Sequence, residues 1–507
     1  MNLIQVIKQS AKFRPGKVFL VSEKEKLTFN QFLERVRQAG AGFKALGVKR
    51  GDKVALLLNN SIEFLEAYFG VIYIGAVIVP LNTFLKSEEV LYILNDCKVK
   101  ALVTSSDFKS VVEGIKPGQA AAMENIISVD DIPGRQAVRF SSLFNSGSAP
   151  EEVMGQDEMA VIIYTSGTTG HPKGAMLSHK NMVSDVENSI DIIGITDKDI
   201  FMAFLPMFHS YSFTANVMIA LYCGCKLVIV KSIQPFTRVV KNLLLHRVSV
   251  FIAIPQIYSV LATKKMPFWF HLINPMRVCI SGGASLPVDS FHKFEKSFNR
   301  PLIEGYGLSE AAPICALNPL YGKRKAASIG PEIHNVRIRI VDDEGRDVKQ
   351  GESGEMIVKG DNVMLGYFNN PEATAQTIKD GWLYTGDVGK KDEEGYIFIM
   401  DRKKDLIIVN GMNVYPREVE EVLYAHPAVV DAAVVGKKDP LHGEIPVGVV
   451  VLKEGANADD KELRRFCKEH MANFKIPHKI EVWKDLPRNS TGKVVKREIR
   501  KMVEEGK

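Results

Sequence analysis

Between residues 54 and 281, short apolar runs rich in β-branched residues alternate with segments in which polar and apolar residues are mixed. The apolar runs have the length of buried strands, and the mixed segments have the spacing of helices that cover a sheet. This alternation predicts an α/β fold with layers of parallel sheet. We expect strands at residues 54–58, 77–79, 101–104, 161–165, 227–230, 250–254 and 278–281, and helices at 87–95, 236–246 and 288–298.

The pattern changes near residue 330, where Val336 to Val341 alternates with a period of two and leads into the turn Asp342 to Gly345. A period of two is typical of strands with one buried face, and turns rich in Asp and Gly join such strands into hairpins. Similar turns follow at residues 351–354 and 392–395. We therefore expect a small β-barrel or twisted antiparallel sheet between about 330 and 400.

A charged run, Asp401 to Asp405, separates this region from another pattern. The last part of the chain predicts helices at 416–425 and 459–471 and strands at 429–435 and 447–452. About one hundred residues is a natural domain size. We therefore expect a large N-terminal domain at residues 1–400 and a small α+β C-terminal domain at residues 401–507.

The composition, 46% hydrophobic and 24% charged, is that of a globular chain, and 507 residues are too many for one simple core. A formal net charge of +6, with Lys and Arg spread along the chain, gives no case for nucleic acid and fits small anionic substrates. The six cysteines show no CxxC pair and no zinc-ligand spacing. Together with an N-terminus unlike a signal peptide, they predict a reduced, cytoplasmic protein.

The longest apolar stretch, residues 67–81, is interrupted by Gly70, Gly75 and Pro80. It is shorter than the roughly 20 residues that a membrane span needs. We interpret it as a buried helix followed by a buried strand.

The strongest chemical pattern is the loop from Tyr164 to Gly174, which follows a predicted strand directly. Its glycines let the backbone approach a phosphate, its hydroxyl and N–H groups can donate hydrogen bonds, and Lys173 supplies positive charge. The spacing is not that of a P-loop, because Lys173 is flanked by Pro172 and Gly174 instead of being followed by Ser or Thr. We therefore expect a phosphate site of another kind.

Several further segments carry aromatic, hydroxyl or charged groups that could serve a ligand site. Residues 304–310 combine an aromatic ring, a hydroxyl and a carboxylate, and a carboxylate can hold Mg²⁺. Asp387 is an acceptor with two oxygens. The other segments are 206–211, 281–284, 402–405, 410–416 and 486–493.

Taken in this order, the segments resemble those of the adenylate-forming superfamily, which holds acyl-CoA synthetases, luciferases and the adenylation domains of peptide synthetases. The resemblance covers essentially the whole chain, and within the superfamily it points to acyl-CoA synthetases of the long-chain fatty-acid–CoA ligase family. It implies that the small C-terminal domain is a mobile lid. One departure is Ser309, where the family usually has Thr; because the hydroxyl is retained, we expect little change in the chemistry.

The resemblance implies roles for individual residues. Lys493 matches the adenylation lysine, and His209 matches the gate between the acyl pocket and the pantetheine channel. Glu310 is expected to hold Mg²⁺ together with Thr165, and Lys404 matches the pivot between the domains. The contacts to ATP and coenzyme A are expected from Thr165, Ser166, Gly167, Thr168, Thr169, Gly170, Lys173, Gly283, Ala284, Glu304, Tyr306, Gly307, Ser309, Asp387, Arg402, Lys404 and Gly411.

The reaction that the resemblance implies joins a carboxylic acid, in particular a medium- or long-chain fatty acid, to coenzyme A at the expense of ATP. It needs Mg²⁺ and passes through an acyl-adenylate. Segments 251–255 and 311–315 are apolar, and no basic residue there stands ready for a second carboxylate, which favours an aliphatic acid. An aryl acid, or transfer to a carrier protein in place of coenzyme A, is an open alternative.

Two other classes of protein are disfavoured. The spacing around Lys173 argues against a P-loop NTPase or a nucleotide-controlled binding module. A non-catalytic relative is disfavoured because the five expected residues are all present: Lys173, Glu310, Asp387, Arg402 and Lys493. The expected partners are small molecules; a homodimer and a peripheral membrane contact stay open, although no amphipathic anchor stands out in the sequence.

Overall fold

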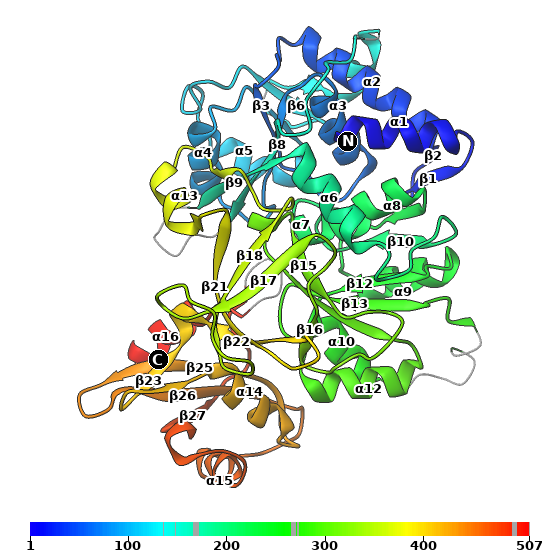
Figure 1. Cartoon of the computed structure of the whole chain (residues 1–507). Helices are drawn as coiled ribbons and strands as arrows, with labels where there is room; N and C mark the ends of the chain where they lie inside the picture. The colour runs from blue at the N-terminus through cyan, green and yellow to red at the C-terminus, as the bar shows by residue number, and fades with distance from the viewer. Residues whose placement is uncertain are drawn as a thin grey trace.

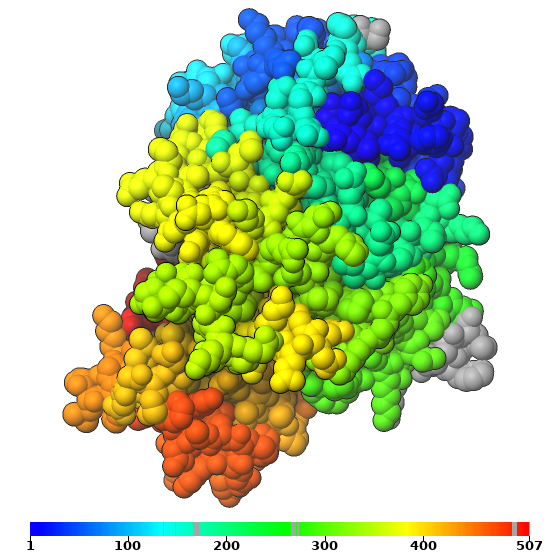
Figure 2. Space-filling model, viewed as in Figure 1, coloured from blue at the N-terminus to red at the C-terminus, as the bar shows by residue number. Residues whose placement is uncertain are grey.

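The computed structural model describes residues 1–134, 136–147, 149–165, 172–264, 270, 273–488 and 494–505. These residues form four β-sheets, two of them eight-stranded and covered by helices (Figure 1). The space-filling view shows residues near 330–400, in yellow-green to yellow, between the N-terminal part of the chain and the orange-to-red C-terminal part (Figure 2). Among the described helices, none combines the length and the hydropathy needed to cross a bilayer.

The first eight-stranded sheet has the order β15-β14-β13-β12-β10-β11-β1-β2. Its inner strands pair in parallel, and an antiparallel pair closes each edge. The strands are β1 (Val18–Val21), β2 (Lys26–Thr28), β10 (Ile200–Ala203), β11 (Lys226–Ile229), β12 (Val250–Ala253), β13 (Val278–Ser281), β14 (Leu302–Gly307) and β15 (Ile314–Leu317).

The second eight-stranded sheet has the order β19-β9-β8-β4-β3-β5-β6-β7; β9 is antiparallel to both of its neighbours, β19 and β8, and the remaining pairs are parallel. Its central strands are buried on both faces, as their continuous apolar runs predict. The strands are β3 (Lys53–Leu56), β4 (Val77–Pro80), β5 (Ala101–Thr104), β6 (Asn125–Ser128), β7 (Val138–Arg139), β8 (Met159–Thr165), β9 (Lys173–Ser178) and β19 (Gly366–Tyr367).

Helices around these sheets begin at residues whose side chains can accept a backbone N–H, as at Asn2, Thr28 and Ser178. Buried apolar residues on their inner faces join the core that the sheets share. The helices are α1 (Leu3–Phe13), α2 (Phe29–Ala45), α3 (Ile62–Tyr73), α4 (Ser87–Asp96), α5 (Lys109–Glu113), α6 (His179–Ser189), α7 (Ser210–Ser212), the π-helix η3 (Phe213–Met218), α8 (Ile219–Cys223), α9 (Phe236–Leu245), α10 (Pro255–Ala262) and α12 (Val288–Phe298).

The third sheet is antiparallel, as the period of two predicts, with the order β16-β22-β21-β18-β17 and β20 paired to β21. It lies against the first sheet, and its apolar side chains belong to the same core. Its elements are β16 (Ser328–Gly330), β17 (Val336–Val341), β18 (Gly354–Gly360), β20 (Ile378–Lys379), β21 (Trp382–Lys391), β22 (Ile397–Arg402) and the neighbouring helix α13 (Pro371–Thr377).

The C-terminal part has a sheet and cores of its own. Its sheet has the order β24-β23-β26-β25, with β27 parallel to β26. The elements are η5 (Lys403–Asp405), β23 (Ile407–Val409), β24 (Met412–Val414), α14 (Pro416–Ala425), β25 (Val429–Asp439), β26 (Gly443–Leu452), α15 (Asp460–His470), β27 (Lys479–Val482) and α16 (Lys496–Glu505).

The predicted fold class is confirmed: layers of largely parallel sheet, an antiparallel region and a small α+β part follow one another along the chain. The expected strands and helices occur, and the stretch 67–81 contains the end of α3 followed by β4. β25 and β26 extend beyond the predicted apolar runs, because polar residues continue the pairing as far as Asp439 and Gly443. The boundary at residues 400 and 401 stays a prediction.

Candidate functional site

The predicted phosphate loop joins two antiparallel strands. Thr165, the last residue of β8, pairs with Lys173, the first residue of β9, so the two ends of the loop lie side by side. Ser166, Gly167, Thr168, Thr169 and Gly170 lie outside the described residues.

Glu310 lies beside this hairpin, in the short helix η4 (Ser309–Ala311). The Thr165 hydroxyl donates a hydrogen bond of 3.4 Å to Oε1 of Glu310. Tyr367, in β19, donates a hydrogen bond of 3.0 Å to the same oxygen, and Nζ of Lys173 lies 5.1 Å from the centre of the Tyr367 ring. Lys173, the predicted phosphate lysine, and Glu310, the predicted metal carboxylate, therefore both contact Tyr367.

Tyr306, Asp387 and Arg402 form a second group. The Tyr306 hydroxyl donates a hydrogen bond of 2.6 Å to Oδ2 of Asp387, and Nε of Arg402 lies 3.2 Å from Oδ1. Asp387 and Arg402 face each other across β21 and β22. Burial, and then the Asp387 carboxylate, raises the pKa of Tyr306 well above its ordinary value, so its hydroxyl stays protonated as a donor. Both oxygens of Asp387 thus have a partner, and each can accept a further hydrogen bond.

The backbone around this group needs small residues at two positions. A Cβ on Gly307 would lie 1.9 Å from the carbonyl oxygen of Pro313, so a side chain there would displace the backbone. Gly283 has a φ of +84°, which favours glycine, and open space surrounds it apart from one methyl of Ile254 at 4.0 Å. Gly283 and the partly buried Ala284 leave a flat face at the end of β13.

Glu304 is buried in β14. Its Oε1 accepts the N–H of Leu286 at 3.1 Å, whereas Oε2 has no hydrogen-bond partner among the described residues. Burial raises the pKa of Glu304 to about 7, and the Arg417 guanidinium opposes that shift. At neutral pH the Glu304 carboxyl is therefore close to the midpoint between its protonated and its ionised form. It lies next to the expected place of the adenine.

The segment that contains His209 contacts Ser309 through Ser210. His209 caps α7, and its Nδ1 accepts the N–H of Tyr211 at 3.2 Å. Ser210 lies 3.1 Å from Ser309, hydroxyl to hydroxyl. Tyr211 donates hydrogen bonds of 3.3 Å to the carbonyls of Ala253 and Ile280, and a Cβ on Gly282 would meet its ring at 2.9 Å.

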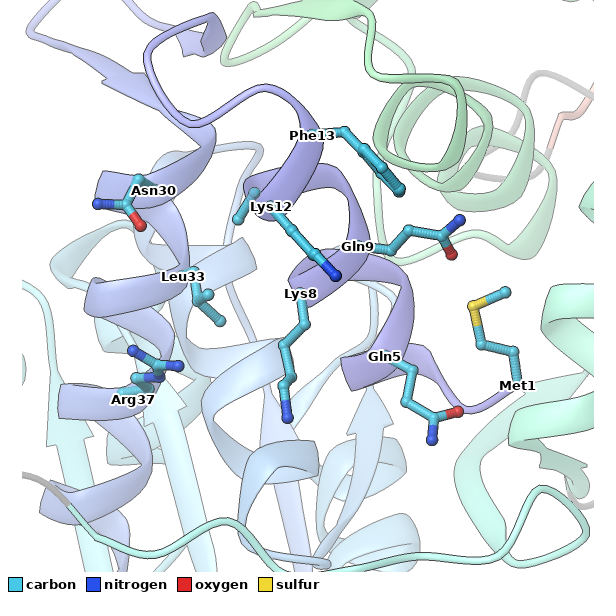
Figure 3. A pocket seen from close by; sticks show the side chains of 10 residues that line it. Met1, Gln5, Lys8, Gln9, Lys12, Phe13, Asn30, Leu33 and Arg37 are labelled. Atoms are coloured by element: carbon cyan, nitrogen blue, oxygen red, sulfur yellow. The ribbon is translucent and has the colours of Figure 1, made fainter.

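Two cavities differ in their relation to these residues. An enclosed apolar cavity of about 10 Å³ is lined by Phe208 and Ser210, on either side of His209, with Tyr68, Pro80, Ile163, Leu177, Met182, Met207, Phe213 and Thr214. This volume is too small for an alkyl chain. The larger surface pocket of Figure 3, about 650 Å³, lies between α1 and α2 and contains none of the predicted site residues.

The junction with the C-terminal part is tied by charged groups. Asp401, in β22, accepts the N–H of Arg417 at 2.9 Å, and the Arg417 guanidinium donates to the carbonyl of Ile399 at 2.7 Å. Nζ of Lys496, the first residue of α16, lies 2.8 Å from Glu420 and 3.6 Å from Asp401. Lys496 therefore links β22, the last strand before the junction, to α16.

Three predicted residues belong to this C-terminal region. Lys404 lies in η5, where partial burial and then the Arg402 guanidinium lower its pKa. Gly411 has a φ of +79° in the two-residue turn between β23 and β24, at the tip of a hairpin. Lys493 lies outside the described residues.

The structure thus groups the predicted residues Thr165, Lys173 and Glu310, then Tyr306, Asp387 and Arg402, and places Ser309 beside the His209 segment. Sequence reasoning missed Tyr367, Ser210 and the pair Asp401 and Lys496. An isolated Gly-Tyr pair or a lysine in a basic tail carries no pattern that distinguishes such residues. Their roles follow only from long-range contacts.

Known proteins resemble the whole chain. The family model described as AMP-binding enzyme matches residues 7–368, and that of the AMP-binding enzyme C-terminal domain matches residues 418–493. A long-chain-fatty-acid–CoA ligase of Bacillus subtilis (strain 168) is 34% identical, over 98% of this chain and 94% of its own. A 2-succinylbenzoate–CoA ligase of Bacillus cereus (strain Q1) is also 34% identical, over 98% of both chains.

One relative, MatB, has been solved both with ATP bound and without it. MatB from Rhodopseudomonas palustris with ATP bound superposes with a TM-score of 0.91, and apo MatB with 0.80. Both are 30% identical to this chain, over 100% of it and 99% of MatB. The chain therefore superposes more closely on ATP-bound MatB than on apo MatB.

The two family models match most of the chain, and the structure places Thr165 beside Glu310 and Arg402 beside Asp387; the chain belongs to the AMP-binding enzyme family of adenylate-forming enzymes. Its activity is that of an ATP-dependent, AMP-forming acid–CoA ligase.

Proposed function

We propose that this ligase activates a medium- or long-chain fatty acid in two half-reactions. In the first, a carboxylate oxygen attacks the α-phosphorus of ATP, and pyrophosphate leaves. In the second, the thiolate of coenzyme A attacks the acyl carbon, and AMP leaves. The observation that carries the proposal is the contact between Thr165 and Glu310 beside Lys173, which unites the phosphate loop with a carboxylate from a distant segment.

The nucleotide would lie across the two groups of residues. Lys173 and the loop hold the leaving phosphates, and Ser309 meets the α-phosphate. Asp387 accepts from the ribose hydroxyls, and Arg402 lies close enough to contact ribose and phosphate. The adenine rests against Tyr306 and the face formed by Gly283 and Ala284.

Mg²⁺ is expected at Glu310 and Thr165. Among the described residues there is no cluster of three or more His, Cys, Asp or Glu side chains placed to bind a metal. This donor set fits Mg²⁺, which commonly uses one or two carboxylates and completes its shell with phosphate oxygens and water. When bound, the ion would neutralise charge on the phosphates.

The adenylation lysine is assigned to Lys493 on the sequence. Two anions repel as the carboxylate approaches the α-phosphate, and an ammonium group between them lowers that cost most where charge develops. The arrangement described here, nearer to ATP-bound MatB, is the one we assign to this step. The C-terminal domain, bounded by the charged run at 401–405, would then rotate about Lys404 and bring the Gly411 hairpin to the acyl-adenylate.

The acyl chain would enter beside His209. The small cavity there is lined by apolar groups, among them Met182 and Met207, whose flexible side chains can move aside for an alkyl chain. The hydroxyl of Tyr211, two residues along the chain from His209, is fixed by the carbonyls of Ala253 and Ile280. An apolar lining supports an aliphatic acid over one with a second carboxylate.

A second candidate substrate is an aryl acid, which the 2-succinylbenzoate–CoA ligase at the same identity keeps open. It would need a wider, flatter pocket between Tyr211 and His209. Transfer to a carrier protein keeps the first half-reaction and differs only in the acceptor.

The test is pyrophosphate release with MgATP and coenzyme A over a panel of short- to long-chain aliphatic acids and aromatic acids. We expect an aliphatic chain to give the highest kcat/KM and Lys493→Ala to lose adenylation. A preference for aromatic acids would replace the substrate assignment. If no acid releases pyrophosphate while ATP still yields phosphate, the synthetase assignment itself fails.

A further inference from the structure

Helix α6 is buried, although one side of it is polar. It connects β9 of the second sheet to β10 of the first, and Figure 1 shows it near the centre of the molecule, between the two sheets. Asn181, Asp185 and Asn188 are all buried, and their spacing of four and then three residues places them on one side of the helix. Because buried polar side chains normally have partners, we expect this row of three residues to hold other parts of the chain.

The two ends of the row hold loops of the antiparallel sheet. Nδ2 of Asn181 donates hydrogen bonds of 2.8 Å to the carbonyls of Asp361 and Val363, which follow β18. Oδ1 of Asn188 accepts a hydrogen bond of 2.9 Å from the side chain of Asn335, which precedes β17. The ends of the row therefore join α6 to the third sheet.

The centre of the row holds Ile314, the first residue of β15. Oδ2 of Asp185 accepts the N–H of Ile314 at 3.2 Å. The carbonyl of Ile314 accepts a hydrogen bond of 2.8 Å from Nδ2 of Asn362, a buried residue in the loop that Asn181 holds. Both backbone polar groups of Ile314 are thus bound by buried side chains, one from α6 and one from the loop after β18.

Ile314 ends the turn that begins with Glu310. Within this turn the N–H of Leu308 donates a hydrogen bond of 3.0 Å to the carbonyl of Pro313. The carbonyl of Glu310 itself accepts the N–H of Met364 at 2.9 Å, so the loop after β18 reaches both ends of the turn. The contacts of Ile314 therefore fix the backbone that carries the proposed metal carboxylate.

The backbone of this turn has a conformation that needs such support. Ala312 has a φ of +66°, in the region that favours glycine. Its carbonyl accepts a hydrogen bond of 3.0 Å from the hydroxyl of Thr214 in η3. Residues in this region keep their conformation only where the surrounding structure holds them. The place of the Glu310 carboxylate therefore depends on contacts made at residues 312 and 314.

Asp185 is neutral in this environment. Burial raises the pKa of Asp185 well above its ordinary value, against the opposing effects of the Ile314 N–H and the Asn362 side chain. Oδ1 of Asp185 and Oδ1 of Asn362 have no hydrogen-bond partner among the described residues. A neutral carboxyl group has the shape of an amide, so an asparagine at residue 185 can keep the bond to Ile314.

We propose that Asp185 and Asn362 are positioning residues, which act through the backbone of Ile314 to set the place of the Glu310 carboxylate and of the Mg²⁺ that it would hold. Neither side chain is assigned a contact with the nucleotide or the metal. The inference rests on the proposed role of Glu310 and does not depend on which acid is activated. Removing a residue that orients a metal ligand commonly lowers metal affinity or activity about 10- to 100-fold.

The experiment measures pyrophosphate release by the full chain at varied Mg²⁺, with the best acid of the panel. We expect Asp185→Ala and Asn362→Ala to raise the Mg²⁺ concentration that gives half the maximal rate by about 10- to 100-fold. Asp185→Asn should stay within about threefold of the wild type, because its oxygen can still accept the Ile314 N–H. Asn188→Ala is the matched control. It removes a buried hydrogen bond of the same row, so it should lower the melting temperature but keep the wild-type Mg²⁺ dependence.

The second half-reaction is read in parallel. Thioester formation from preformed acyl-adenylate, which follows the loss of pyrophosphate, should keep its rate in every variant. Wild-type Mg²⁺ dependence of Asn362→Ala, or an equal shift in Asn188→Ala, overturns the proposal; Asn362→Ala gives the answer if Asp185→Ala does not fold. If the wild type and Glu310→Gln depend on Mg²⁺ alike, the role of Glu310 fails and this inference with it. The proposed function itself fails only if no acid releases pyrophosphate.

Discussion

The proposed nucleotide site and the junction with the C-terminal part both place carboxylates beside cations, but they are anchored differently. Around Glu310 and Asp387, residues from five strands and a short helix contact one another within sheets that share one core. At the junction, Asp401 and Lys496 reach across from separate cores, and Glu420 and Arg417 complete the connection. The first region is preformed, whereas the second consists of a few polar contacts that can be exchanged.

The largest effect should follow from removing charge in the preformed region. We expect Glu310→Gln to lower kcat/KM for adenylation about 10²- to 10³-fold, because the expected metal carboxylate is lost. Acid-dependent pyrophosphate release at varied Mg²⁺ measures it. Glu332→Gln, a carboxylate of the antiparallel sheet paired with Lys391, is the control. A wild-type rate for Glu310→Gln would remove this carboxylate from the site.

A smaller effect is expected at Asp387. Asn keeps the shape but weakens the hydrogen bond from Tyr306 and the contact with Arg402, so we expect KM for ATP to rise about 10- to 100-fold. Steady-state kinetics over ATP concentration give the value. A change confined to KM for the acid would contradict a role on the ribose.

At the junction the effect should be smaller still and confined to one half-reaction. Lys496→Met removes the connection between Asp401 and the helix after the adenylation loop, so adenylation should slow about tenfold. Thioester formation from preformed acyl-adenylate should keep its rate. Both are measured by single-turnover assays.

Two variants sharpen that result. Lys496→Arg should recover adenylation because the charge is kept, and Lys501→Met, at an exposed position of the same helix, should match the wild type. Equal slowing of both half-reactions by Lys496→Met would indicate a loss of folding in place of a loss of positioning.

A buried carboxylate outside both regions should affect stability alone. Glu66 is 1% exposed, and burial raises its pKa to about 8, against the effect of Arg35 at 3.1 Å. The folded state then binds a proton that the unfolded state has released, so stability falls as pH rises from about 5 to 8, by at most about 1.4 kcal/mol per pH unit. Glu66→Gln should flatten this slope in urea unfolding at several pH values. An unchanged slope would mean that Glu66 is ionised in the folded state.

The sequence predicted most of the fold because buried parallel strands need continuous apolar runs, as at residues 101–104 and 278–281. Local patterns such as residues 304–310 also carried the carboxylates and cations of the proposed nucleotide site, whose roles stay predictions. The sequence did not predict Tyr367 or the link between Asp401 and Lys496. Those contacts depend on how β19 pairs with β9 and how α16 packs, and neither leaves a local pattern.

The bond between Asp387 and Arg402 has a consequence for affinity. In the proposed site, a ribose that binds Asp387 would meet a carboxylate that already has two partners, Tyr306 and Arg402. The dissociation constant of ATP would then contain the free energy of rearranging these three residues as well as the energy of the new contacts. A nucleotide lacking a ribose hydroxyl would require the same rearrangement but would form fewer contacts. The difference in affinity between it and ATP would therefore depend partly on the hydrogen bonds present in the protein without ligand.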